Sequence, residues 1–184
     1  MMRGRRGARM VRRCLMGVAM IACAGGAVSC APSEAKTPAH AAVQLYAMLD
    51  ALGVQAVPDS LSLTALRPFL SDSLAEALAH ADQARRAAAR ERPDEKPVFA
   101  DGDPFSSLFE GRTSARPDTT ITHGDTALVV MAFTNNTQRP AVNWRDTVVV
   151  TREQGRYVVA DIRYGTAWEF GFTGRLLDLL RTRA

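Results

Sequence analysis

The chain has few of the residues on which common enzyme mechanisms depend. Its 184 residues include three cysteines and three histidines, and aromatic residues make up only 7% of the sequence. The G-x-S-x-G motif of a serine-hydrolase nucleophile is absent. His40 lies near the start and His123 in a predicted turn, so only His80 falls on a helix face where a pocket could form. A nucleophilic triad is therefore a weak interpretation.

The chain also lacks an apolar run long enough to cross a membrane. The longest uncharged, mostly apolar segment has 15 residues, from Cys14 to Val28, whereas a transmembrane helix needs about 20. Six arginines precede this run and small residues follow it, which is the order of a secretory signal peptide. We therefore expect residues 1–29 to be a signal peptide, 30–37 a tether and 38–184 a single domain. A retained amphipathic anchor is the alternative.

Cysteine usage agrees with export. Cys14 and Cys23 lie in the predicted signal peptide, so Cys30 alone would remain and no intramolecular disulfide could form. The segment AVSC, residues 27–30, resembles the lipobox of bacterial lipoproteins, although Ala27 replaces the larger aliphatic residue usual there. The resemblance implies that Cys30 is acylated, for instance with palmitate, and becomes the new N-terminus. Ordinary cleavage beside Ser29 or Ala31 is the alternative.

Lipidation would fix the location of the protein. Two or more acyl chains give stable membrane attachment, whereas one chain gives only marginal binding. Ala31 stands where inner-membrane lipoproteins of many Gram-negative bacteria carry aspartate, so the same resemblance implies the periplasmic face of the outer membrane. We expect a cell-envelope protein whose partners are the membrane, through Cys30, and an envelope protein or small ligand.

The basic net charge of +4 belongs to the predicted signal peptide. Six of the 23 basic residues lie within the first 13 positions, and no acidic residue precedes Glu34, so 17 basic residues face 19 acidic ones in the mature chain. Its net charge is then about −2. Because nucleic-acid binding needs a basic patch on the folded domain, we expect no nucleic-acid partner.

Residue patterns in the mature chain predict an α+β domain. Thr37, Pro38 and Gly53 bracket one helix, a short helical turn ends near Pro68, and a longer helix starts at Ser71 or Ser73. From about residue 113 the pattern alternates, with turns at 123–125 and 153–155, and a short helix begins near residue 173. We expect N-terminal helices packed on a curved four-stranded antiparallel sheet, with a short C-terminal helix.

Three motifs then resemble a family of small exported bacterial proteins and lipoproteins whose domain has no established function. They are G-D-P-F at 102–105, W-R-D at 144–146 and Y-V-V-A-D-I-R-Y-G at 157–165. The resemblance implies the cone-shaped, cystatin-like fold of nuclear transport factor two. Since relatives of that fold include enzymes, binding modules and immunity proteins, it implies a shape and a compartment rather than a reaction.

The stretch KPVFADGDPFSSLFEG, residues 96–111, is the richest in candidate ligands. Asp101, Asp103 and Glu110 could hold a metal ion, but Pro104 and Phe105 interrupt the spacing of a calcium loop. We favour a structural corner in which the aspartates accept amide hydrogen bonds. Neither a metal nor a cofactor is expected.

Strand alternation predicts a second group of polar residues. Asp161 and Arg163 are two apart and share a strand face with Tyr157 and Val159, opposite a face that carries Val158 and Ile162. A cross-strand ion pair is the simple explanation. If that face is concave, a pocket at the mouth of the cone would be lined by Asp101, Asp103, Tyr157, Asp161, Arg163 and His80.

No complete catalytic set accompanies the predicted anchor. We therefore expect a noncatalytic ligand- or protein-binding domain. One alternative is an envelope enzyme that uses carboxylates and His80, and perturbed pKa values in an enclosed pocket would favour it. Another is an immunity or inhibitor protein that presents residues 96–111, which would require an exposed patch of phenylalanines.

Overall fold

The described part of the chain begins with helices, and strands follow them. The structure is a computed structural model, which describes residues 35–183. The order is α1 (Pro38–Leu52), α2 (Ser60–Leu66), a 3₁₀ turn (Arg67–Phe69) and α3 (Asp72–Glu91). After a long loop come β1 (Ser114–His123), β2 (Thr126–Asn135), β3 (Val142–Glu153) and β4 (Arg156–Arg163), and α4 (Leu176–Arg183) follows.

Local sequence accounts for where the helices begin and end. The Thr37 hydroxyl accepts a hydrogen bond from the His40 amide, and Pro38 occupies the first turn of α1, as predicted. Gly53 ends α1 with φ at 63°, a left-handed conformation that favours glycine. For α3 the structure selects Ser71 as the N-cap, since its hydroxyl accepts from the Leu74 amide.

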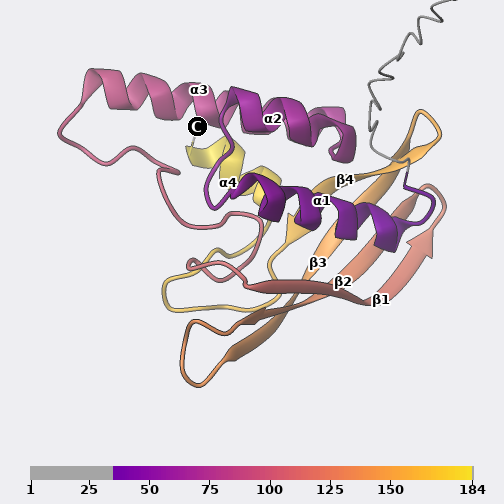
Figure 1. Cartoon of the computed structure of the whole chain (residues 1–184). Coiled ribbons are helices and arrows are strands. Elements are labelled where there is room, and N and C mark those ends of the chain that lie inside the picture. The colour runs from indigo at the N-terminus through magenta and orange to yellow at the C-terminus, as the bar shows by residue number, and fades with distance from the viewer. Residues whose placement is uncertain (1–34, 184) are drawn as a thin grey trace, which may run out of the picture. The chain divides into compact units, whose positions relative to one another are not determined.

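The four strands form one antiparallel sheet in the order β1-β2-β3-β4, and this confirms the predicted fold class. The turns lie at the two predicted hairpins, between His123 and Thr126 and between Glu153 and Arg156. All helices lie on one side of the sheet (Figure 1). The α1 helix packs directly against the sheet, whereas α3 packs against α2, α4 and β4.

Two bulges interrupt the ladders. In β1 the register shifts between Pro117 and Thr119, and the intervening Asp118 pairs with Arg145. In β4 the register shifts at Ala160, because Val150 pairs with Val159 and Val149 with Asp161. An extra residue on one strand reverses the alternation beyond it.

The bulge at Ala160 corrects the predicted faces of β4. Tyr157 and Val159 belong to the core side before the bulge, and Ile162 and Tyr164 belong to it after the bulge. The sequence alternation had placed these two pairs on opposite faces. Asp161 is buried and pairs with Arg175, and Arg163 is exposed, so the predicted ion pair between Asp161 and the neighbouring strand β3 is not formed.

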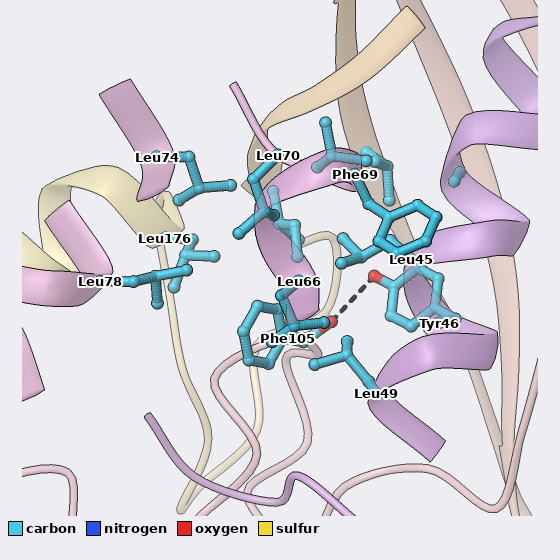
Figure 2. Packing of buried hydrophobic residues seen from close by; sticks show 14 of the residues in the cluster. Leu45, Tyr46, Leu49, Leu66, Phe69, Leu70, Leu74, Leu78, Phe105 and Leu176 are labelled. Carbon is cyan, nitrogen blue, oxygen red and sulfur yellow. Dashed lines mark hydrogen bonds between the residues drawn. The ribbon is translucent and has the colours of Figure 1, made fainter. Parts of the chain in front are cut away.

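The hydrophobic core fills the space between the sheet and the helices. Figure 2 shows leucines of α1, α2 and α3 packed around Phe105 and Leu176 of α4. Phe105 belongs to the long loop between α3 and β1, which we call the crossing loop. From the sheet, Phe133 packs edge-on to Tyr46 at 5.1 Å between ring centroids and tilted to Trp144 at 5.5 Å. The side of the sheet that faces the helices is therefore occupied by packed side chains.

Candidate functional site

The stretch 96–111 is a corner whose middle, residues 103–108, is buried. Asp103, Phe105, Ser106 and Ser107 are all buried. One Asp103 oxygen accepts the Phe105 amide at 2.9 Å, an Asx-type turn that Pro104 preforms. The Asp103 amide donates to the Phe109 carbonyl at 3.0 Å, which closes the loop on itself.

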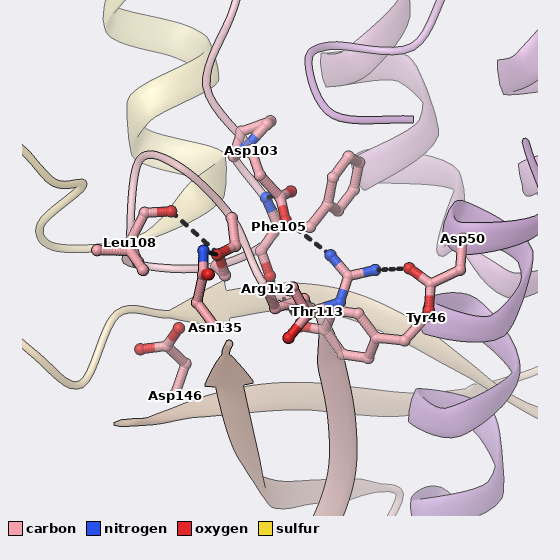
Figure 3. A network of polar contacts seen from close by, with 12 residues as sticks. Tyr46, Asp50, Asp103, Phe105, Leu108, Arg112, Thr113, Asn135 and Asp146 are labelled. Carbon is pink, nitrogen blue, oxygen red and sulfur yellow. Dashed lines mark hydrogen bonds and ion pairs between the residues drawn. The ribbon is translucent and has the colours of Figure 1, made fainter. Parts of the chain in front are cut away.

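Arg112 ties this corner to α1. One terminal nitrogen of its guanidinium lies 2.7 Å from Asp103, and the other lies 2.7 Å from Asp50 of α1 (Figure 3). The guanidinium carbon lies 4.5 Å from the centre of the Tyr46 ring, a cation–π contact. The Tyr46 hydroxyl donates to the Phe105 carbonyl at 2.9 Å. The Arg112 and Asp103 side chains are only 3% and 4% exposed, so loss of either member of this pair would leave a charge in the interior.

Asp146 holds a second set of segments together. It lies on the core side of β3 and is 1% exposed. One oxygen accepts the Ser107 amide at 2.7 Å and the Trp144 indole N–H at 3.2 Å, and the other accepts the Gly165 amide at 2.8 Å. This carboxylate therefore joins the crossing loop to the segment that follows β4.

Burial dominates the electrostatics of these groups. It raises the pKa of Asp103, and the nearby Arg112 charge acts in the opposite direction without cancelling it. Burial likewise raises the pKa of Asp146 against the hydrogen bonds from Gly165 and Ser107, and it raises the pKa of Tyr46 well above its usual range. Because both oxygens of each aspartate already accept hydrogen bonds from the protein, these shifts accompany a structural role.

Asp161 performs a comparable task at the start of α4. It accepts the amides of Ile162 and Leu177 at 2.8 and 3.0 Å, and Arg175 pairs with it at 2.6 Å. A carboxylate near a helix N-terminus satisfies free amides and complements the helix dipole. It therefore fixes α4 to the edge of β4.

The six predicted pocket residues are distributed over separate places. Asp103 and Asp161 are buried in the contacts just described, and Asp101 forms an exposed pair with Lys96 at 2.6 Å. Tyr157 packs against the core, 5.8 Å from the Arg152 guanidinium, and Arg163 is exposed. His80 is also exposed, in a groove beside α4. The structure therefore does not gather these six residues into one pocket.

Sequence reasoning missed the residues that organise the corner. Arg112, Asp50 and Tyr46 come from two segments some 60 positions apart, and no local pattern links them. Asp146 did leave a signal, since it is an acidic residue at an inward position between Trp144 and Val148. A carboxylate in that place must be satisfied by buried donors.

Hydrogen bonds join the crossing loop to the loop after β4, and we call the joined loops the loop platform, defined as residues 103–109 and 165–174. The Phe172 amide donates to the Ser107 carbonyl at 2.9 Å, and the Trp168 indole donates to the Ser107 hydroxyl at 3.1 Å. The Phe109 and Phe172 rings lie 5.9 Å apart. A side chain at Gly171 would come within 2.6 Å of the Ser107 carbonyl, so the two loops approach as closely as glycine allows.

One aromatic side chain on the loop platform points to solvent. Phe170 is 78% exposed, and Phe109 at the platform edge is 36% exposed. Trp168 and Phe172, two positions before and two after Phe170, are held by the contacts to Ser107. A rigid backbone therefore presents a large apolar ring to the outside.

Other features of the described residues bear on the function. Within residues 35–183 no group of three or more His, Cys, Asp or Glu side chains is placed to hold a metal ion. In the same range no helix is long and apolar enough to cross a membrane. Cys30 lies outside the described residues, so its lipidation remains a prediction.

Comparisons of the chain with protein-family models, with curated proteins and with solved structures found no match.

Proposed function

We propose that this protein is a cell-envelope protein, anchored through lipidated Cys30, whose domain binds another protein without catalysing a reaction. The observation that carries the binding role is Phe170, an aromatic ring 78% exposed on a pinned loop. Aromatic side chains contribute much of the binding free energy at protein–protein interfaces.

Rigidity makes this aromatic ring an effective contact. Binding costs free energy whenever a mobile loop or side chain must be ordered. The hydrogen bonds from Phe172 and Trp168 to Ser107 already order the loop, and Asp146 holds its first residue, Gly165. When a partner with a complementary apolar pocket binds, ordering the loop platform would therefore cost little free energy.

The state of the carboxylates favours binding over catalysis. A general acid or base needs an oxygen that can reach a substrate, either directly or through one water. The buried oxygens of Asp103, Asp146 and Asp161 accept hydrogen bonds from backbone amides, arginines or an indole instead. Nothing in these contacts supports the enzyme alternative.

An immunity or inhibitor role is one form that this binding could take. It required the phenylalanines of 96–111 to form an exposed patch, but Phe99 and Phe105 are buried and only Phe109 reaches the surface. The apolar ring offered to a partner comes mainly from the second loop, as Phe170. Such a role would thus use the loop platform rather than the crossing loop alone.

Replacing Phe170 with serine tests the proposal. The tagged full chain is expressed in its native envelope, crosslinked with formaldehyde and recovered, and the attached proteins are compared between variants. We expect recovery of the specific partner to fall by tenfold or more, which corresponds to about 1.4 kcal/mol. Leu61→Ser is the matched control, because Leu61 of α2 is 80% exposed and lies outside the platform. Equal recovery with Phe170→Ser and wild type would reject the platform as the binding surface.

The predicted anchor has its own test. Cys30→Ala removes the only cysteine outside the predicted signal peptide. We expect the variant to leave the membrane fraction and to lack the mass of the acyl chains, because attachment depends on them. Continued membrane attachment with the same mass as wild type would reject lipidation at Cys30.

A further inference from the structure

A groove runs between α3 and the last turn of α4, away from the loop platform. Its volume is about 360 Å³, and it is lined by Ser73, Glu76, Ala77, His80, Leu180 and Arg181. The four α3 residues follow the spacing i, i+3, i+4 and i+7, which places their side chains along one helix face. Ligand pockets range from about 300 to 1,000 Å³, so this groove can hold only a small molecule.

The lining combines an apolar floor with charges of both signs. Ala77 is partly buried, and Leu180 is almost completely buried. Glu76 on α3 and Arg181 on α4 border the groove from its two sides, and His80 lies one turn beyond Glu76. A ligand in the groove would therefore meet an acid, a base and an apolar surface together.

Glu76 and Arg181 do not neutralise each other. Among the described residues neither forms an ion pair, although Asp82 on the same helix pairs with both Arg85 and Arg86. Opposite charges that border one groove without contact leave room for a molecule between them. Such a molecule gains most if it carries a cation for Glu76 and an anion for Arg181.

We propose that this groove binds a small zwitterion with an apolar side chain, namely an apolar amino acid or a short apolar peptide. The ammonium group would bind Glu76, and the carboxylate would bind Arg181 through charge-assisted hydrogen bonds. The side chain would cover Ala77 and Leu180. A purely anionic amphiphile would leave Glu76 beside its head group, and a pure cation would face Arg181, so both fit the groove less well.

Calorimetric titration of the purified full chain with leucyl-leucine tests this inference. We expect saturable binding with a Kd below about 1 mM. N-acetyl-leucyl-leucine, which lacks the ammonium, and leucyl-leucinamide, which lacks the carboxylate, should each bind at least tenfold more weakly. Equal binding of all three compounds, or no saturable binding of leucyl-leucine, would overturn the proposal.

Variants then assign the two ends of the ligand. Glu76→Gln should abolish the preference for leucyl-leucine over its acetylated form, and Arg181→Gln should abolish the preference over the amide. Glu91→Gln and Arg90→Gln change the same charges at the exposed far end of α3 and should leave both preferences intact. If the control variants lower affinity as much as the groove variants, the effect reflects net charge and the site is rejected. Phe170→Ser should not alter this binding, so the proposal for the groove and the proposal for the loop platform can be rejected independently of each other.

Discussion

Asp146→Ala is expected to lower the free energy of unfolding by about 3 to 5 kcal/mol, because it removes the acceptor of two buried donors and one partly buried donor. The Ser107 amide and the Trp144 indole would lose their partner in the interior, and the Gly165 amide would lose it at a partly buried position. Each unsatisfied buried donor costs about 1 to 3 kcal/mol. Urea unfolding followed by far-UV circular dichroism measures the change.

Two further variants sharpen this experiment. Asp146→Asn keeps one acceptor oxygen in the same place, so its loss should be smaller than that of the alanine variant. Asp125→Ala removes an exposed carboxylate from the β1–β2 turn and should leave the unfolding midpoint unchanged. A loss below about 1 kcal/mol for Asp146→Ala would mean that water replaces the carboxylate and that the loops are not held by it.

Arg112→Met is expected to lower the free energy of unfolding by about 3 to 5 kcal/mol, because it leaves a buried carboxylate without its counter-charge. Asp103 loses its guanidinium partner, and Tyr46 loses the cation above its ring. Methionine retains much of the apolar volume, so the loss reports charge rather than a cavity. The same urea experiment measures it.

A double variant separates the effect of lost charge on stability from the effect of lost packing. Arg112→Met combined with Asp103→Asn should be more stable than Arg112→Met alone, because asparagine removes the stranded charge and still accepts the Phe105 amide. Arg145→Met breaks the exposed pair with Asp118 and should leave the unfolding midpoint nearly unchanged. If the double variant is no more stable than the single one, the loss in Arg112→Met does not come from the unpaired charge of Asp103.

Local signals explain why much of the fold could be predicted. Thr37, Pro38 and Gly53 act through atoms within a few residues, and the hairpin turns follow from neighbouring positions. Alternation then distinguishes the strands from the preceding helices. These elements lead directly to the α+β arrangement, because their apolar faces must cover one another.

The candidate site could not be predicted in the same way. A single extra residue at Ala160 exchanged the faces of β4, and a bulge leaves little trace in the alternation of one strand. Asp82, a charged residue of α3, is buried under Arg85 and Arg86, so charge alone does not indicate exposure. The contacts of Arg112 and Asp146 depend on which distant segments meet.

The register shift in β1 affects whether two copies of this protein can pair through the edges of their sheets. β1 is the first strand of the sheet order, and all but one of its residues are exposed. An open edge of ten residues could template the backbone of a second chain and so start aggregation. Pro117 has no N–H to offer, and the register shift beside it bends the edge. This short segment thus keeps the edge from recruiting another strand.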